Sequence, residues 1–384
     1  VLNRHLYRST SNQPYEEWLR NTQPFHWIAE FYDIIKGEQG FDVIIGNPPY
    51  VEHTALKNYK VPKCQTSSCG NLYANCAEKA FILKEQKGRF GFIVPISISC
   101  SKRMVPLQKI LLTNGTYFSN WSWRPSKLFD GNKSANLSLS VIISTGGLYN
   151  FSSTYKRWNV EARYYIFNNI SYTNIPINLQ GNIIPKLGTT IENRLYHKIS
   201  KLPSMLLEYS KIETSYKLYY KRTGGLYWKI FTDYQPTLFL NDKQTFSSKE
   251  EHLCFKNQKS LCAAICIYWS DLYWWWYQIN SDVRNNNPSD LLSLPINKSF
   301  MTDDKLQETA KNLMSDIQNK AIWAERKFKG NISRYKSFIP KLSKPIIDKI
   351  DKVLAKHYGF TDEELDFIIN YDIKYRMGDE LNEE

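Results

Sequence analysis

The sequence predicts an α/β protein, in which a layered domain with a mainly parallel sheet precedes a mixed α and β domain and a C-terminal helical region. Three observations carry this prediction. A β-branched strand ends in a proline-containing loop, strand and helix patterns alternate up to about residue 150, and apolar residues recur at helical spacing after residue 300. We expect domains at 1–150, 151–300 and 301–384.

The first predicted strand is Phe41–Ile45, a β-branched run that ends at Gly46. The Pro48-Pro49 pair behind it cannot continue a strand or start a helix interior, so a stiff loop follows. Residues Asn71–Lys84 have helical spacing, with Gly88 as the expected stop. The apolar run Phe90–Pro95 then predicts a second strand.

A second helix is expected at Val105–Leu112 and a third strand at Leu137–Ser144. The resulting order is strand, helix, strand, helix, strand. This alternation is typical of a mainly parallel sheet covered by helices.

Residues 151–300 consist of short aromatic and β-branched pieces, such as Tyr164–Phe167 and Lys217–Tyr220, between Asn, Gly and Pro clusters. We expect an irregular domain of mixed α and β type. The aromatic run Tyr268–Tyr277 is interpreted as a strand, whose side chains alternate between two faces, so most of them should pack in the core instead of forming a base-stacking platform.

The C-terminal region is predicted to begin with a long helix that has Thr302 as its N-cap. Its apolar positions recur every three or four residues: Leu306, Ala310, Leu313, Ile317, Ala321, Ala324 and Phe328. A second helix is expected from about Pro345 to Gly359, and a capping box of Thr361 and Glu364 starts a third.

The charge distribution favours a polyanionic partner. The net charge is +13, but residues 361–384 hold nine acids against two bases, which leaves +20 on residues 1–360. The aromatic content of 15% offers surfaces on which bases could stack. Composition alone leaves nucleic-acid binding open, since many basic proteins bind none.

The seven scattered cysteines indicate reduced thiols in the cytoplasm. Their spacing matches no zinc pair, and we predict no metal site. The apolar stretch Leu261–Tyr277 is too short and too polar at its centre to span a membrane. The polar opening segment and the first residue, Val1, suggest a piece of a longer protein.

The segment Asn47-Pro48-Pro49-Tyr50 carries the chemistry. An exocyclic aromatic amine is a poor nucleophile, because its lone pair is delocalised into the ring. The side-chain oxygen of Asn47 and the backbone carbonyl of Pro48 can accept its two N–H groups, while Pro49 stiffens the loop and Tyr50 stacks on the base. The plain alternative is a turn, but ligands of open α/β sheets bind at the carboxyl ends of strands.

The stretch Phe41–Val51 closely resembles the catalytic loop of adenine-specific DNA methyltransferases, in particular the Eco57I-like restriction-modification methylases. Residues Gly70–Tyr73, Gly88–Pro95 and Leu128–Gly131 support the resemblance, which spans about residues 25–145. Farther on, Ser281–Asp290 and Tyr371–Met377 resemble the end of the family's target-recognition region and its C-terminal helices. These later stretches extend the likeness almost to the end of the chain.

The resemblance implies a partial Rossmann-like methyltransferase domain at 1–150, a target-recognition domain at 151–300 and a helical region at 301–384. It implies transfer of a methyl group from S-adenosylmethionine to N6 of a flipped adenine in double-stranded DNA. Asn47, Pro48, Pro49 and Tyr50 would be catalytic, and Tyr73 would contact the cofactor. Arg284 and Asn285 are the candidates for reading base edges.

One departure from the family is clear. Its members bind S-adenosylmethionine through a Phe-x-Gly-x-Gly-type turn upstream of the catalytic loop, and residues 1–46 contain no such turn. An N-terminal half or a nuclease region would then lie outside this chain. The alternatives are a non-catalytic DNA-binding fragment, half of a split enzyme, or a methyltransferase of ribosomal RNA or of a protein glutamine. The proposed chemistry needs no histidine, so His26, His53 and His357 are interpreted as structural.

Overall fold

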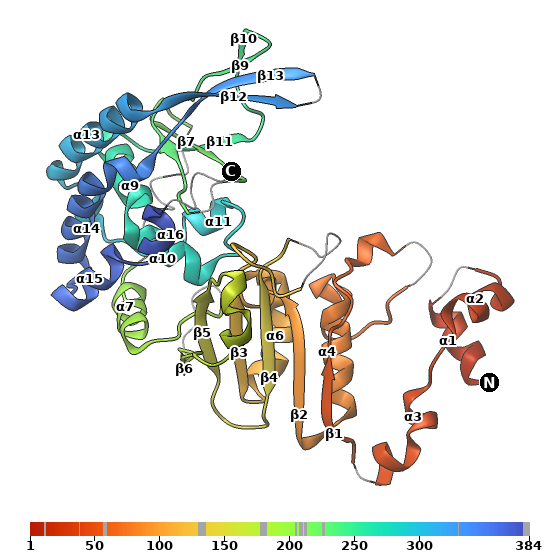
Figure 1. The fold of residues 1–384 in the computed structure, drawn as a ribbon. Coiled ribbons are helices and arrows are strands. Elements are labelled where there is room, and N and C mark those ends of the chain that lie inside the picture. The colour runs from red at the N-terminus through yellow and green to blue at the C-terminus, as the bar shows by residue number, and fades with distance from the viewer. Residues whose placement is uncertain are drawn as a thin grey trace. The chain divides into compact units, whose positions relative to one another are not determined.

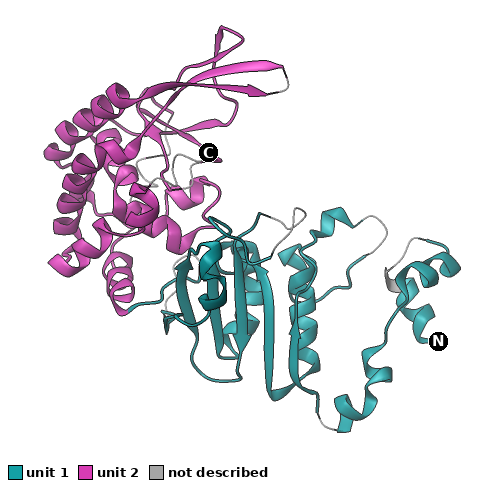
Figure 2. Ribbon diagram, in the orientation of Figure 1, with its two compact units in different colours: residues 1–189 teal, residues 190–384 magenta. Residues whose placement is uncertain are grey.

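The structure is a computed structural model that describes residues 1–10, 13–37, 39–56, 60–129, 136–176, 183–203, 206, 210, 213–224, 227–328 and 330–378. The chain divides into two compact units, Val1–Thr189 and Thr190–Glu384 (Figure 2). The expected boundaries at 150 and 300 differ from this division. Strands that follow residue 150 join the sheet of unit 1, and the helices that follow residue 300 pack within unit 2.

Unit 1 is built on a six-stranded sheet with the order β1-β2-β4-β3-β5-β6 (Figure 1). Its strands are β1 (Phe41–Gly46), β2 (Lys84–Pro95), β3 (Thr116–Trp121), β4 (Leu139–Ser144), β5 (Phe151–Lys156) and β6 (Tyr172–Asn174). Strands β1, β2, β3 and β5 share one direction, and β4 and β6 run against it.

The expectation of a mainly parallel sheet is therefore wrong, since only two of the five neighbouring pairs are parallel. Strands β3 and β4 follow one another in the sequence, and the described residues between them contain no helix that could carry a parallel crossover. The sequence patterns also missed β3, which contains Ser119 and Asn120 among its buried residues.

Helices cover one face of this sheet. They are α4 (Leu72–Leu83), α5 (Ser97–Cys100) and α6 (Val105–Leu112), and their apolar residues share a core with Phe90, Phe118 and Ile142 of the strands. The predicted helices at 71–84 and 105–112 are confirmed. Asn71 caps α4, because its side-chain oxygen accepts a hydrogen bond from the N–H of Tyr73.

The sequence predicts that Gly88 ends the helix, but this residue lies inside β2. The strand begins at Lys84, directly after α4. A side chain here would meet the neighbouring strand, because a Cβ atom on Gly88 would lie 2.7 Å from the carbonyl oxygen of Phe41. The residue is a glycine because β1 and β2 approach closely at this point.

The other face of the sheet is open at the β1 edge. Ile44 packs against the core, so its neighbours Val43 and Ile45 lie on the opposite face, where they are 61% and 83% exposed. The register places Ile45 beside Gly91 and Gly91 beside Ile143, which is 44% exposed. Three apolar side chains thus form an uncovered strip on this face.

The N-terminal segment of unit 1 is helical: α1 (Leu2–Thr10), α2 (Tyr15–Thr22), α3 (Trp27–Glu30) and a π-helical turn, Asp33–Gly37. Trp18 is buried between the rings of Tyr7 and Tyr15. Trp27 makes an edge contact with Phe41, which connects this segment to the start of β1.

Unit 2 combines two small sheets with a group of helices. The strands are β7 (Lys217–Lys221), β8 (Phe231–Thr232), β9 (Leu238–Leu240), β10 (Lys243–Thr245), β11 (Glu250–Cys254), β12 (Ile322–Phe328) and β13 (Asn331–Ser337). They form the sheets β11-β7-β8 and β10-β9-β13-β12. The helices are α7 (Thr190–Ser200), α9 (Gln258–Trp269), α10 (Asp271–Asn280), α11 (Pro288–Leu291), α12 (Lys298–Met301), α13 (Asp304–Lys320), α14 (Lys344–Tyr358), α15 (Asp362–Ile369) and α16 (Ile373–Met377).

The aromatic run Tyr268–Tyr277 is not a strand but the end of α9 and most of α10. All residues of α10 are buried, because the helix is surrounded within its unit by α9, α14 and α15. The expectation that these aromatic residues pack in the core is confirmed, although it assumed that they form a strand and they are helical. A helix that is apolar on every side belongs in the interior of a protein.

The predicted long helix ends earlier than expected. Helix α13 stops at Lys320 and has Asp303, not Thr302, as its N-cap, and the region of Ala324 and Phe328 forms the strand β12. The spacing of these two apolar residues fitted a helix by coincidence, since pairing with β13 decides the conformation. Tyr164 and Tyr165, in one of the short aromatic pieces, belong to a 3-10 helix, Val160–Tyr165.

The last predicted helices are confirmed. Gly359 ends α14 in the left-handed conformation, with φ of 65°, and Thr361 and Glu364 form the capping box of α15. None of the helices in the described part of the chain is long and apolar enough to cross a membrane.

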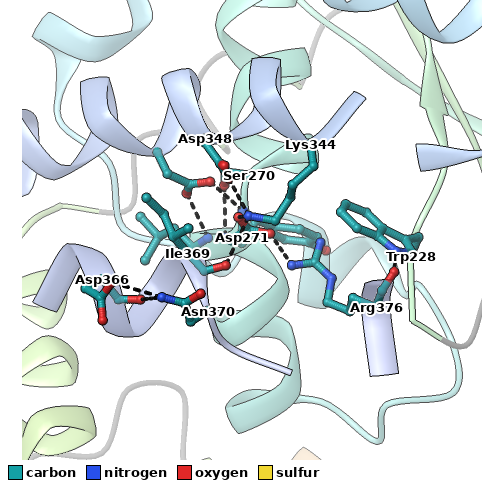
Figure 3. Close-up of polar contacts among 12 residues, drawn as sticks. Trp228, Ser270, Asp271, Lys344, Asp348, Asp366, Ile369, Asn370 and Arg376 are labelled. Atoms are coloured by element: carbon teal, nitrogen blue, oxygen red, sulfur yellow. Dashed lines mark hydrogen bonds and ion pairs between the residues drawn. The ribbon is translucent and has the colours of Figure 1, made fainter. Parts of the chain in front are cut away.

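A buried ionic network ties the last helix to the aromatic core of unit 2 (Figure 3). The carboxylate of Asp271 is paired with Arg376 and, at 3.1 Å, with Lys344. The guanidinium of Arg376 also lies 3.6 Å from the ring centroid of Trp228. Asp351 accepts the first N–H groups of α10, and burial together with the charge of Asp271 raises its pKa well above the usual value.

Candidate active site

The loop Asn47-Pro48-Pro49-Tyr50 starts where β1 ends. Asn47 and Pro49 are exposed, Pro48 is buried and Tyr50 is half-buried. No other described residue forms a hydrogen bond with the side chain of Asn47. An exposed amide that the described residues do not engage is therefore presented directly after a strand of the sheet.

Tyr50 is fixed at both ends of its side chain. Its hydroxyl donates a hydrogen bond of 2.8 Å to the carbonyl oxygen of Ile93 in β2. Its ring makes an edge contact with Tyr73, with ring centroids 6.4 Å apart and planes at 88°. Burial raises the pKa of Tyr50 to about 12, so the hydroxyl remains a neutral donor at physiological pH.

The chain after Tyr50 is attached to the start of α4. The N–H of Leu72 donates to the carbonyl of Val51, and the N–H of His53 donates to the carbonyl of Gly70, both at 2.9 Å. The imidazole of His53 contacts the side-chain oxygen of Asn75 at 2.7 Å. These contacts give His53 the structural role that was expected.

Glu52 and Arg103 form a two-armed ion pair beside the loop. The two terminal nitrogens of Arg103 donate to the two carboxylate oxygens of Glu52 at 2.8 and 2.6 Å. The amide of Asn71 donates to the same carboxylate at 3.1 Å. The hydrogen bonds and charge of Arg103 hold the pKa of Glu52 below its usual value, although partial burial opposes this shift.

Sequence reasoning missed this pair. Arg103 is separated from Glu52 by 51 residues, and no local pattern connects them. Through its hydrogen bond with Asn71, the N-cap of α4, the pair holds the chain at the point where it leaves the Asn47–Tyr50 loop. Neither residue belongs to the Asn47–Tyr50 segment, so we assign to the pair a role in positioning this segment.

Tyr73, expected to contact the cofactor, is buried beneath the loop and only 1% exposed. Its hydroxyl lies 3.2 Å from the Oγ atom of Ser97 and donates to the sulfur of Met104 at 3.1 Å. In this position Tyr73 supports the ring of Tyr50.

Arg284 and Asn285 lie in unit 2, in the loop between α10 and α11. Arg284 is exposed, whereas the amide of Asn285 donates to Asp282 at 3.0 Å. The two next asparagines also have structural partners: Asn286 donates to the carbonyl of Lys221, and Asn287 caps α11. Of this group, Arg284 has the side chain that is most accessible to a ligand.

Among the described residues, one group has the composition of a metal site: Glu213, His252 and Cys254. The sulfur of Cys254 lies 3.5 Å and the Nε2 atom of His252 lies 4.0 Å from the carboxylate of Glu213. However, Lys217 already pairs with this carboxylate at 2.8 Å, and a metal ion would compete with its positive charge. We assign the group to the ion pair.

The sequence was compared with those of known proteins. Residues 2–129, the segment that contains the loop, match the family described as Eco57I restriction-modification methylase. The match covers about a third of the chain, and this segment is similar to the Eco57I methylases. The confirmed resemblance includes the loop and α4. In the supporting stretch Leu128–Gly131, the residues Asp130 and Gly131 lie outside the described residues.

A protein of Methanocaldococcus jannaschii named as a type II restriction enzyme and methyltransferase is 35% identical over 106 residues. The matched region is 28% of this chain and 9% of that relative. The matched segment thus corresponds to a small part of the Methanocaldococcus jannaschii protein.

The fold is similar to that of the type IIL restriction-modification enzyme MmeI, whose structure was solved in complex with DNA. The TM-score is 0.50 at 12% identity, over 93% of this chain and 59% of the MmeI chain. A nuclease-deletion mutant of the type ISP enzyme LlaGI, bound to a DNA substrate mimic, has a TM-score of 0.37 at 11% identity, over 91% and 52% of the two chains.

Proposed function

We propose that this chain is the base-binding and DNA-reading part of a DNA methyltransferase that modifies N6 of adenine in a restriction-modification system. The observation that carries the proposal is the Asn47-Pro48-Pro49-Tyr50 loop at the carboxyl end of β1, in which Asn47 is exposed with a free side chain and Tyr50 is anchored. The match of residues 2–129 to the methylase family supports a methyl-transfer role.

The proposed task of the loop is to prepare the adenine amine. The side-chain oxygen of Asn47 and the backbone carbonyl of Pro48 accept its two N–H groups, which draws the nitrogen towards tetrahedral geometry and makes its lone pair available. Acceptors held by two prolines need no rearrangement during the reaction. No residue of the loop has to act as a strong base, because one amine proton is released after the nitrogen has become cationic.

Tyr50 is proposed to receive the adenine after it has left the duplex. Extrusion of a base costs a few kcal/mol, and stacking on an aromatic ring returns about 1–3 kcal/mol. A ring that is already fixed by Ile93 and Tyr73 loses little conformational freedom when the base binds.

S-adenosylmethionine is the proposed methyl donor, but the residues of this chain do not form a complete site for it. The sequence lacks the glycine-rich turn of the family, and Tyr73 is buried under the loop. We therefore assign to this chain the binding and orientation of the base. A cytoplasmic location is proposed, in agreement with the free thiol state of all seven cysteines.

A second candidate is half of an enzyme that another polypeptide completes. The open strip of Val43, Ile45 and Ile143 beside the β1 edge favours it, because contiguous exposed apolar surface on a sheet is characteristic of an interface. Methyltransferases of ribosomal RNA or of protein glutamine share the loop, but the large unit 2 argues against them, as does the family of residues 2–129.

The test is transfer of a radiolabelled methyl group from S-adenosylmethionine to duplex DNA by the complete enzyme of which this chain forms the base-binding part, together with equilibrium binding of the donor. We expect Asn47→Ala to abolish transfer, and the exposed Asn319→Ala on α13 to leave it unchanged. Transfer at the wild-type rate by Asn47→Ala would exclude the proposed chemistry. Binding of the donor that appears only when a second polypeptide is added would favour the second candidate.

A further inference from the structure

The β12–β13 hairpin of unit 2 is the most exposed regular element outside the catalytic loop. Figure 1 shows it extending beyond the helices of its own unit. Six of the seven residues of β12 are exposed, and Trp323 and Phe328 are 51% and 63% exposed. The strand therefore exposes an aromatic side chain on each of its two faces.

The hairpin is strongly basic. In the sequence of residues 322–337, five bases stand against Glu325, which gives a net charge of 5 − 1 = +4. The bases are Arg326, Lys327, Lys329, Arg334 and Lys336. Such a density of positive charge on one ribbon matches a polyanion.

One face of the hairpin holds an arginine in a fixed position. The register places Arg334 opposite Glu325 on β12 and opposite Phe239 on β9. The guanidinium lies 5.0 Å from the ring centroid of Phe239 and 5.5 Å from that of Trp323, and these rings are in contact with each other. Arg334 is thus ordered before any ligand binds.

We propose that the β12–β13 hairpin binds double-stranded DNA by entering its major groove. The choice of DNA as the partner rests on the proposed function, whereas the surface is independent of the catalytic loop. Strand β13 also pairs with β9 through Ser333, Arg334 and Tyr335, so the two-stranded part of the hairpin is the end beyond these residues. A two-stranded ribbon fits the major groove of B-DNA, which is about 12 Å wide, and side chains on it and beside it can reach the base edges and the phosphates there.

The residues divide into two roles. Arg326 and Lys327 contact phosphates, which sets the position of the hairpin on the duplex without reading its sequence. Arg334 reads a base edge, and guanine is its expected partner because the O6 and N7 atoms accept both arms of a guanidinium. The hairpin is therefore a second element for base recognition, besides the loop that contains Arg284.

The test uses the full chain, a fluorescent DNA duplex and no methyl donor, with binding measured by anisotropy at several salt concentrations. The double variant R326Q/K327Q should reduce the slope of log Kd against log salt by about 2, since each lost phosphate contact removes about 1. The matched control K352Q/K356Q removes the same charge from the exposed face of α14 and should leave the slope close to that of the wild-type chain. Circular dichroism shows whether each variant is folded.

An unchanged slope in R326Q/K327Q, or an equal reduction in the control, would overturn the proposal. Equal binding of an RNA duplex would also overturn it, because the major groove of A-form RNA is too deep and narrow to be read. Selection of sites from random duplexes should show that R334Q loses preference at one guanine. These assays contain no methyl donor, so they can fail while Asn47→Ala still abolishes transfer, or succeed while no transfer occurs.

Discussion

The hydroxyl of Tyr50 donates a hydrogen bond of 2.8 Å to the carbonyl oxygen of Ile93, and this bond joins the loop after β1 to the neighbouring strand β2. The two strands are parallel, so their carboxyl ends lie at the same edge of the sheet. The position of the Tyr50 ring is thus determined by the sheet and not by the loop alone.

Two substitutions of Tyr50 separate this bond from the ring. Tyr50→Phe should lower the free energy of unfolding by about 1 kcal/mol, since it leaves the Ile93 carbonyl with one partner fewer. Tyr50→Ala should also weaken binding of the extruded base by about 1–3 kcal/mol. Urea unfolding measures the first effect, and fluorescence of 2-aminopurine at the target position measures the second. Equal base binding by the alanine variant would show that the ring does not stack.

The raised pKa of Tyr50 predicts a pH dependence of stability. The pKa is about 12 in the folded chain against an ordinary value of 10.0, so the folded state holds this proton more tightly than the unfolded state. The resulting stabilisation is complete below pH 10 and is lost as the pH rises to about 12. The stability difference between the wild-type chain and Tyr50→Phe should therefore shrink between these two pH values. A constant difference would contradict the assignment.

The ion pair of Glu52 and Arg103 should affect activity more than stability. Both side chains are nearly half exposed, so loss of the pair in Glu52→Gln should cost less than about 1 kcal/mol of stability. The rate of methyl transfer should be affected more strongly than the stability, because the chain is no longer held where it leaves the loop. The reversed pair E52R/R103E should restore part of the rate relative to E52R alone. Absence of any rescue would mean that the pair does not position the loop.

The buried carboxylate of Asp271 makes Arg376 important for folding. Arg376→Met removes one of its two cationic partners, and breaking a buried pair in this way costs about 3–5 kcal/mol. The exposed Lys352→Met on α14 is the control and should change stability little. Denaturant unfolding of both variants gives the comparison, and similar midpoints would show that the pair contributes little.

Local patterns predicted the parts of the fold that local interactions determine. The capping box of Thr361 and Glu364 and the stop at Gly359 each involve residues within a few positions of one another. The strand before Asn47 was likewise visible as a β-branched run before two prolines. These features depend on backbone geometry and nearest neighbours, so the sequence displays them directly.

The sequence by itself thus determined the Asn47–Tyr50 loop, its preceding strand and the main helices around them. Tertiary structure decided the rest: the antiparallel place of β4, the helical state of the aromatic run, the β12–β13 hairpin and the pairing of Glu52 with Arg103. The physical reason is that each of these depends on partners distant in sequence. Their hydrogen bonds and buried surface exceed the weak local preferences that a short pattern records.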